Sequence, residues 1–549
     1  MNMPAAPHIF FSNHWKNGVR IFQSLELFAL LLGAAWADEP SPVFGTNEQA
    51  HLQTALACLN MTERDAGFEK DLGKPVVVLP WIRRLLDDPL SLPGVADRVF
   101  GLASSREPDG LWSAAFDWLG VKRPDDKAAA KTRTLFKGLD PELADALGLF
   151  VQAAGQADAL LDKAFDQVTE KDRRYAVASY FAGTFNAEDK AEVRAALEQF
   201  GLDKKDIEEA IHESQAIDPE PAATRFLAVV QKTDLAALLS AGQVFHQAVR
   251  ELCDRCLKIE AWPDKTTSFE TPLGRIAIGS AGNDKHADDG LLILEPSGND
   301  IYSSAVRLFS RDRLSAIVDL QGDDTYSGRG IKAPGSAVFG VAALMDASGD
   351  DLYKAEFTGQ GAAFFGAAWV TDNAGDDVYR AYAHAQGAGY AGFGVLEDNQ
   401  GNDLYEVGLL GQAYAGVLGI GLLIDRDGND RYVAGGREHD YERNDERYLS
   451  LAQGCAIGTR PFAGAGLAAL VDLAGNDTYS ADVFGQGVGY WYGVGMLLDA
   501  SGHDTYTMYQ YGQGSGIHMS LGLLADGAGN DFYTGFILVQ GNAHDYGGG

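Results

Sequence analysis

The sequence predicts an α+β multidomain chain, with an N-terminal α-helical bundle followed by a parallel β-solenoid of about nine to ten coils. Two observations carry this prediction. An eight-residue motif recurs nine times between residues 295 and 533, and a stretch of amphipathic helical runs precedes it. The motif reads acid, two variable residues, Gly, Asn or Asp, Asp, one residue, Tyr; residues 472–479 and 526–533 are clear copies. A fixed period in sequence indicates one unit stacked on itself.

Residues 1–37 have the features of a secretory signal peptide. Lys16 and Arg20 precede an apolar stretch at 27–35, which ends in the small-x-small sequence 35–37. We expect cleavage after Ala37 and export to the periplasm or the extracellular space. The alternative is an uncleaved anchor, but the apolar run is short for a membrane span of about 20 residues. The mature chain is predicted to have no transmembrane segment.

Residues 38–270 are predicted to form an α-helical domain. Amphipathic runs cover 142–168 and 233–257, and a helix that begins near Asn186 ends at Gly201. A domain of this length can bury a core of its own. Because the open ends of a solenoid need covering, we expect this domain to be the N-terminal cap.

The chain has four cysteines, Cys58, Cys253, Cys256 and Cys455. Cys253 and Cys256 have CxxC spacing, but no second pair completes a zinc site and no His follows for haem attachment. In an exported protein a structural disulfide is the more ordinary interpretation. It would join Cys58 to Cys253 or Cys256, and the full pairing stays open.

Residues 271–549 are predicted to form the repeat β-solenoid. The last Asp of the motif recurs at intervals of 24 to 27 residues, with one interval of 47. A unit of about 27 residues suits one coil of three short strands and three turns. Before each motif, large and small residues alternate, as Leu344 and Ala342 do. This alternation is expected of a row that fills a narrow core.

The other positions of the same strand are also apolar, as Trp369, Val395 and Leu422 show. Strands that are apolar on both faces are usually covered on both faces. Either the inward and outward positions are misassigned in some coils, or the outer side of this sheet is covered. The cover would be the N-terminal domain or a second copy of the chain, so this surface predicts a protein partner or a homodimer.

Stacking the motif produces two columns of aspartates, and these columns imply a cation. Carboxylates one coil apart lie roughly 4.8 Å from each other and repel by roughly 1 kcal/mol in water, and by more in a protein. Bound Ca²⁺, Asx-type turns that donate backbone N–H groups, or raised pKa values that keep some carboxyls protonated can each offset this repulsion. The inner column is Asp300, Asp324, Asp351, Asp377, Asp403, Asp430, Asp477, Asp504 and Asp531, and the outer column is Asp319, Asp346, Asp372, Asp398, Asp425, Asp472, Asp499 and Asp526.

The blocks 475–479 (Gly-Asn-Asp-Thr-Tyr) and 529–533 (Gly-Asn-Asp-Phe-Tyr) resemble half of the calcium-binding nonapeptide repeat of RTX proteins. In that family the repeats form a parallel β-roll with Ca²⁺ between the turns. The resemblance implies that the inner aspartates from Asp324 to Asp531 are Ca²⁺ ligands, with the outer column from Asp346 to Asp526 supplying further oxygens. The chain departs from the family because its nonapeptide is not tandem and each coil has one acidic turn. It is also similar to uncharacterised exported bacterial proteins with this longer repeat.

Two further columns are predicted to be ladders within the coil stack, one of aromatic rings and one of amides. The alternative use of aromatic rings is a glycan-binding strip formed by Phe364, Tyr390, Tyr490, Trp491 and Tyr492. The tyrosine column is Tyr302, Tyr326, Tyr353, Tyr379, Tyr405, Tyr432, Tyr479, Tyr506 and Tyr533, and the glutamine column is Gln360, Gln386, Gln412, Gln453, Gln486, Gln513 and Gln540.

A loop insertion at 435–448 accounts for the 47-residue interval. Insertions in solenoids become surface loops, and loops often carry function. The insertion brings together His439, Asp440, Glu442, Arg443 and Asp445, although the simpler interpretation is a tolerated polar loop. A glycan or a protein is the partner that this loop would bind.

The net charge of −33 argues against nucleic acid as a partner and favours cations. No nucleophile elbow, phosphate-binding loop, dinucleotide motif or zinc-protease helix is visible. We therefore expect an exported, Ca²⁺-binding scaffold for surface, adhesion or assembly interactions rather than an enzyme. The alternative is a carbohydrate-active β-helix enzyme, or a glycan-binding protein, that acts on extracellular polysaccharide. Catalysis would break the repeat at one place, and only the insertion does so.

Overall fold

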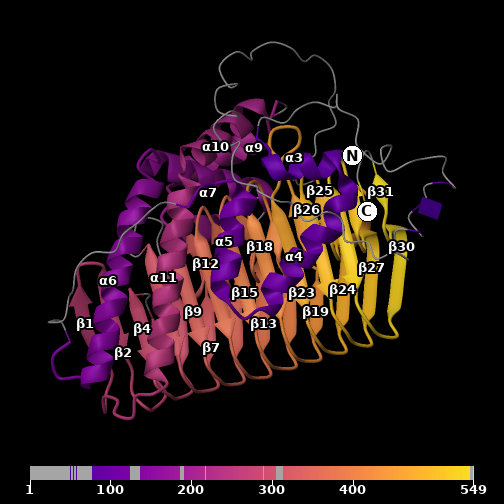
Figure 1. Cartoon of the computed structure of the whole chain (residues 1–549). Coiled ribbons are helices and arrows are strands. Elements are labelled where there is room, and N and C mark those ends of the chain that lie inside the picture. The colour runs from indigo at the N-terminus through magenta and orange to yellow at the C-terminus, as the bar shows by residue number, and fades with distance from the viewer. Residues whose placement is uncertain are drawn as a thin grey trace.

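The computed structural model describes residues 50, 53, 54, 57, 77–123, 136–185, 191–216, 218–287, 290–304, 313–544 and 548. Helices form the first part of the chain and a parallel β-solenoid forms the second (Figure 1), which confirms the predicted fold class. The predicted signal peptide lies outside the described residues. None of the described helices is long and apolar enough to span a membrane.

The helices begin where the sequence supplies a cap or a proline. Asp140 accepts the backbone N–H groups of the first turn of α6, and Thr169 and Asp172 form a capping box on α7. Pro80 and Pro108 each stand at the first position of a helix, where no N–H is needed. The helices are α3 (Pro80–Asp87), η2 (Pro89–Ser91), α4 (Leu92–Ser104), α5 (Pro108–Leu119), α6 (Pro141–Ala164), α7 (Glu170–Thr184), α8 (Ala191–Gln199), α9 (Lys204–Ser214), α10 (Glu220–Lys232) and α11 (Leu235–Cys256).

The solenoid has three sheets, which we name the helix-covered sheet, the tyrosine sheet and the short-strand sheet. Like residues pair in register from coil to coil, as Leu344 with Val370 and Tyr353 with Tyr379 do. The helix-covered sheet holds β1 (Thr267–Thr271), β2 (Gly274–Ile278), β4 (Leu292–Glu295), β6 (Leu314–Asp319), β9 (Val341–Asp346), β12 (Ala367–Asp372), β15 (Phe393–Asp398), β18 (Ile420–Asp425), β23 (Leu467–Asp472), β26 (Val494–Asp499) and β29 (Leu521–Asp526).

The other two sheets complete the coils. The tyrosine sheet holds β3 (Lys285–His286), β5 (Ile301–Ser304), β7 (Thr325–Gly328), β10 (Leu352–Ala355), β13 (Val378–Ala383), β16 (Leu404–Leu409), β19 (Arg431–Ala434), β20 (Glu438–Asp440), β21 (Asn444–Ala452), β24 (Thr478–Gly485), β27 (Thr505–Gly512) and β30 (Phe532–Val539). The short-strand sheet holds β8 (Ala337–Val338), β11 (Ala363–Phe364), β14 (Gly389–Tyr390), β17 (Tyr414–Ala415), β22 (Cys455–Ile457), β25 (Val488–Tyr490), β28 (Ser515–Ile517) and β31 (Ala543–His544).

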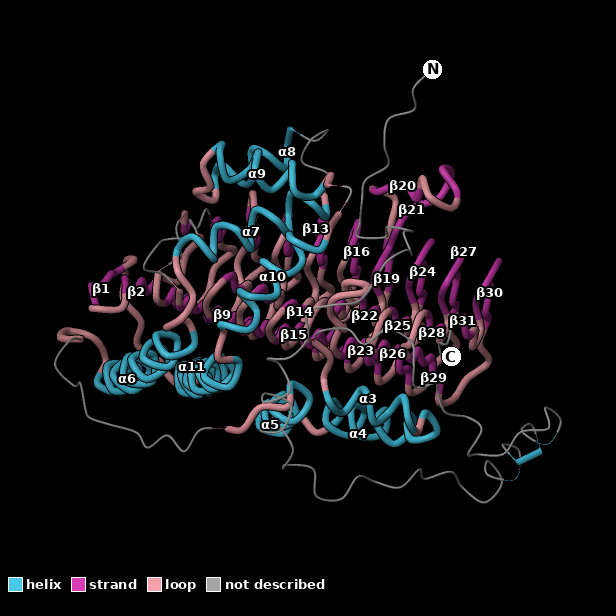
Figure 2. Tube along the Cα trace, turned by 90° about the horizontal axis from the view of Figure 1, so that it is seen from above, coloured by secondary structure: helices cyan, strands magenta, loops and turns pink. Residues whose placement is uncertain are grey.

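Helices cover the outer side of the helix-covered sheet. Figure 2 shows α6, α11, α5 and the α3–α4 pair in a row along this face. Trp369, which points outward from β12, packs against Trp112 of α5 and stacks on His246 of α11, with ring centroids 5.7 and 4.3 Å apart. Leu344 and Val370 lie instead in the cluster inside the coils. The predicted inward row is therefore confirmed, and the N-terminal helices, rather than a second copy, cover the outward one.

The expected N-terminal cap is wrong in its placement. The helices lie along the side of the solenoid and share one hydrophobic core with it. The first end of the helix-covered sheet is closed instead by β1, which pairs antiparallel with β2 and begins at Thr267, before the predicted boundary at 270. Cys253 and Cys256 are buried free thiols, as is Cys455, and Cys58 lies outside the described residues.

Candidate metal centre

The two aspartate columns meet at the turn between the helix-covered sheet and the tyrosine sheet. An outer aspartate ends a strand of the first sheet, as Asp372 ends β12, and an inner one directly precedes a strand of the second, as Asp377 precedes β13. The motif glycine permits close stacking, because a Cβ at Gly349 would lie 1.4 Å from the carbonyl oxygen of Gly322. From Asp300 to Asp504 every member of both columns is at most 4 % exposed.

Each outer aspartate is held by two kinds of donor. Its Oδ1 accepts the backbone N–H two residues later, as Asp346 accepts from Ser348 at 3.0 Å, so the predicted Asx-type turn is present. Its Oδ2 accepts the phenol of the preceding coil, and Tyr326 donates to Asp346 at 2.5 Å. The same phenol–carboxylate pair recurs as Tyr353–Asp372, Tyr379–Asp398, Tyr405–Asp425, Tyr432–Asp472 and Tyr479–Asp499, at 2.6 to 2.8 Å.

Each inner aspartate has one oxygen satisfied and one left over. The Oδ1 of Asp377 accepts the backbone N–H of Asp351, one coil earlier, at 2.6 Å. The Oδ2 atom has no hydrogen-bond partner although it is buried. The aspartates with such an Oδ2 are Asp300, Asp324, Asp351, Asp377, Asp403, Asp430, Asp477 and Asp504. An unsatisfied buried acceptor is costly, and a charged one more so, which indicates that a proton or a cation lies at these atoms.

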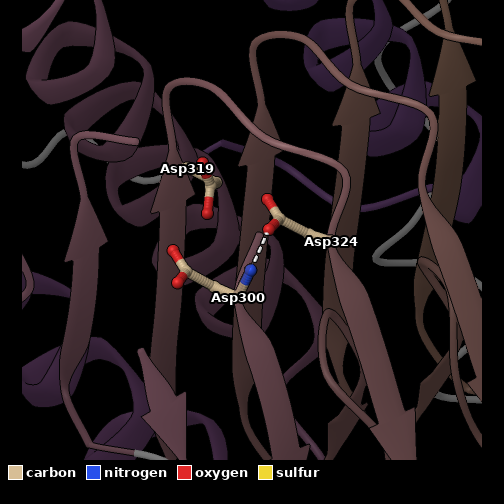
Figure 3. Close-up of side chains that lie close together, drawn as sticks. All are labelled: Asp300, Asp319 and Asp324. Atoms are coloured by element: carbon tan, nitrogen blue, oxygen red, sulfur yellow. Dashed lines mark hydrogen bonds between the residues drawn. The ribbon is translucent and has the colours of Figure 1, made fainter. Parts of the chain in front are cut away.

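The unsatisfied oxygens lie in clusters of three carboxylates. Figure 3 shows one cluster, in which Asp319 faces Asp300 and Asp324. One oxygen from each member lies within 4.8 Å of the other two, and the cluster recurs along the stack. The clusters include Asp300–Asp319–Asp324, Asp324–Asp346–Asp351, Asp351–Asp372–Asp377, Asp377–Asp398–Asp403 and Asp403–Asp425–Asp430. Consecutive clusters share an inner aspartate, so they form one continuous row.

Burial shifts the acid–base behaviour of this row. Loss of water, followed by the charge of neighbouring aspartates, raises the pKa of Asp377 and Asp430 to about 10. The same causes raise the pKa of Asp351 to about 7 and that of Asp403 to about 8. In the absence of a cation the row therefore holds several protons at neutral pH.

The row changes at both ends. In the first coil Glu295 takes the outer position, and its Oε1 contacts His286, which stands in the tyrosine column. Burial raises the pKa of Glu295 to about 10. In the last coil the predicted ligands Asp526 and Asp531 are only half-buried. The central coils therefore place the predicted ligands together best.

The tyrosine ladder is confirmed. Rings from Tyr302 to Tyr533 stack at centroid distances of 4.6 to 4.8 Å. The glutamines also bridge coils, but each amide donates to backbone carbonyls; Gln360 donates to Tyr353 of its own coil and to Arg380 of the next. The glycan-binding strip is wrong, because Phe364, Tyr390, Tyr490, Trp491 and Tyr492 are all at most 7 % exposed.

The insertion forms the β20–β21 hairpin, and its polar groups bind one another. Asp440 is 2 % exposed and forms an ion pair with Arg443 at 3.0 Å. Arg443 also lies over the ring of Phe484, while Arg447 lies over Tyr509 at 4.3 Å. These contacts fold the hairpin onto the tyrosine sheet and leave no open cluster of acid and base.

Sequence reasoning missed one column, at the variable position before each inner aspartate. Asp350 accepts the backbone N–H of Asp376 at 2.9 Å, and Asp376 accepts that of Asn402 at the same distance. This exposed ladder explains why the motif prefers Asn or Asp there, because both side chains offer the accepting oxygen. The preference itself was the signal that could have identified it.

The fold and this row define a β-solenoid with a helical side layer and an internal spine of aspartates. No protein-family model matches the chain, and neither characterised proteins nor solved structures yield a match.

Proposed function

We propose that the protein is an exported scaffold for surface, adhesion or assembly interactions, whose solenoid is braced by a row of Ca²⁺ ions in the aspartate spine. The observation that carries the proposal is the inner Oδ2 atom, which is buried and unpartnered in eight coils and lies against the outer aspartate of its cluster. A repeated vacancy of one kind calls for a repeated ligand.

Charge supports a divalent ion. Each central coil contributes two carboxylates, one inner and one outer, so one divalent cation per coil neutralises the spine. Ca²⁺ binds oxygens at about 2.3–2.6 Å, and an ion midway between two oxygens 4.8 Å apart reaches both. A proton on each inner aspartate would neutralise only half of the charge.

The donor set favours Ca²⁺ over softer metals. The clusters from Asp300 to Asp430 offer carboxylate oxygen only, whereas zinc and copper sites use imidazole and thiolate. Mg²⁺ demands small octahedral sites and retains its waters, which a spine without solvent contact does not accommodate. The likeness of the motif to RTX repeats supports the same ion.

Burial also argues for a scaffold. A polysaccharide cannot touch carboxylates that are at most 4 % exposed, so the two columns cannot supply the acid and base of a glycoside hydrolase. The rings expected to bind a glycan are buried as well. The residues that motivated the carbohydrate-active alternative therefore cannot reach such a substrate.

Calorimetry and thermal unfolding of chelator-treated residues 38–549 test the ion. We expect about one Ca²⁺ per coil and a large rise in the unfolding midpoint, because a ligand of the folded state stabilises it. Mg²⁺ should have little effect. Native β structure in chelator, with no calcium binding and no shift, would overturn the proposal.

An isosteric pair of variants locates the ions. Asp377→Asn keeps the Oδ1 that accepts the N–H of Asp351 but removes one charge from two clusters. It should stabilise the calcium-free protein and reduce the calcium-induced rise. The control, Asp376→Asn, changes the neighbouring exposed residue and should leave that rise unchanged. Equal effects of the two variants would place the ions outside the spine.

Export has its own test, which is the N-terminal sequence of the protein purified from cells. We expect it to begin at Asp38, in a compartment where millimolar Ca²⁺ is available. A chain that retains residues 1–37 would contradict export by a cleaved signal peptide and leave the calcium result unaffected.

A further inference from the structure

The coil stack ends in an uncovered face at β29, β30 and β31, drawn in yellow in Figure 1. Each tyrosine of the ladder from Tyr302 to Tyr506 is at most 2 % exposed, whereas Tyr533 is 37 % exposed. One face of its ring stacks on Tyr506 at 4.6 Å. The other face, which would meet the next ring in any earlier coil, is left to solvent.

The strand at this end is built like an interior strand. Among the described residues β30 pairs only with β27, so one backbone edge is unpaired. Natural edge strands are usually short, charged, bulged or interrupted by proline. β30 has eight residues and none of these features; Phe532, Phe536 and Ile537 on it are 65, 72 and 43 % exposed.

The opposite end differs. There β1 pairs antiparallel with β2, and Phe269 of β1 packs on Phe136 of the helical layer at 5.3 Å. This end offers no parallel edge that could continue the coil stack. A second copy therefore cannot bind head to tail, and the two ends of the solenoid are not complementary.

We propose that the C-terminal face binds the same face of a second copy of this chain, coil against coil about a two-fold axis. The face is continuous with the established coil-to-coil interface, because it presents the ring, the strand edge and the acidic turn that every earlier coil buries against its neighbour. A partner must match a strand edge and an aromatic ring at a spacing of about 4.8 Å. Another coil of this repeat does so.

The two-fold arrangement limits the assembly to two chains. β30 pairs antiparallel with its copy, and Tyr533 covers the ring of its copy, so each face is used once. Asp526 and Asp531 approach their copies as the carboxylates of consecutive coils do throughout the stack. The contact excludes the hairpin and the helical layer.

Sedimentation equilibrium of residues 38–549 in calcium-containing buffer tests the assembly. We expect a concentration-dependent mass that levels off at two chains. The double variant Phe536→Lys/Ile537→Lys places charge on the open edge and should stay monomeric with an unchanged unfolding midpoint. The matched control is Leu257→Lys/Tyr441→Lys, which alters two side chains of 57 and 58 % exposure elsewhere and should dimerise like the parent.

Spin labels distinguish this face from any other. In a Cys58→Ser background, which leaves only the three buried native thiols, a label at Thr534→Cys should lie close to its copy in the dimer, and one at Tyr441→Cys should not. A parent that is monomeric at every concentration, a polymer larger than two chains, or a dimer in which the 534 labels are far apart would each overturn the proposal.

Discussion

At the scale of one residue, Tyr432 shows what a motif position contributes. Its ring lies between those of Tyr405 and Tyr479, each 4.8 Å away. Its hydroxyl donates to Oδ2 of Asp472 at 2.8 Å. The same side chain therefore links the core of the coils to the acidic spine, which explains why the motif requires Tyr rather than Phe.

Tyr432→Phe separates the two roles. Stacking is retained, but Asp472 loses a donor in a site without solvent contact. We expect the free energy of unfolding to fall by about 1.5–3 kcal/mol, the range for a hydrogen bond to a charged group. Denaturant unfolding measures this change. Tyr441→Phe is the control because Tyr441 is 58 % exposed, and an equal loss in both variants would contradict the assigned role.

At the scale of one element, the aspartate column predicts an unusual pH dependence for the calcium-free protein. The folded-state pKa is about 8 for Asp403 and about 10 for Asp377, while an unfolded Asp titrates near 3.9. The folded state therefore holds more protons than the unfolded state throughout this window, and its stability must fall as pH rises.

Thermal unfolding in chelator at several pH values between 5 and 9 should show the midpoint falling with each increase. With saturating Ca²⁺ the slope should flatten, because the ion replaces the protons, and calcium binding should release protons into the buffer. A calcium-free midpoint that rises with pH over this range would mean that the carboxylates are ionised and stabilised by other means.

The hairpin makes a second prediction at this scale. Removal of residues 435–448 restores the nine-residue separation between Asp430 and Gln453 that the other coils have. The variant should fold with the same circular dichroism and lose only the packing of Arg443 and Arg447 on the tyrosine sheet, a drop of a few degrees in the midpoint. Failure to fold would show that the hairpin is part of the solenoid core.

At the scale of the whole molecule, the helical layer and the solenoid depend on each other. Trp112, His246 and Trp369 lie at their junction, and Arg426 of the solenoid bonds to Ala103 of α4 and to Glu397. Burying an ion pair there is favourable only when both partners are held in place. The two parts form one folding unit rather than a scaffold with a detachable cap.

Residues 263–549 expressed alone should therefore aggregate and bind hydrophobic dyes. The outward residues Trp369, Val395 and Leu422 would form an exposed apolar face, which soluble proteins avoid. Residues 38–549 are the control. A soluble shorter chain with a sharp unfolding transition would show that the helices are dispensable. Light scattering and dye fluorescence make the comparison.

Much of this protein could be predicted from the sequence because the information repeats. The period set the coil, the alternation of Leu344 and Ala342 identified the inward row, and the motif placed Asp, Tyr and Gln in columns. Stacking in register turns a local pattern into a three-dimensional one without any long-range choice. For the same reason the candidate ligands were identified correctly as groups that lie side by side.

What only the tertiary structure decided is where unlike surfaces meet. The sequence could not show that the helices cover the side of the solenoid and leave its end to β1, because both placements bury apolar residues. It could not show that one oxygen of each inner aspartate stays unsatisfied, since that depends on which neighbour the other oxygen binds. Such contacts join residues far apart in the chain, and no periodicity encodes them.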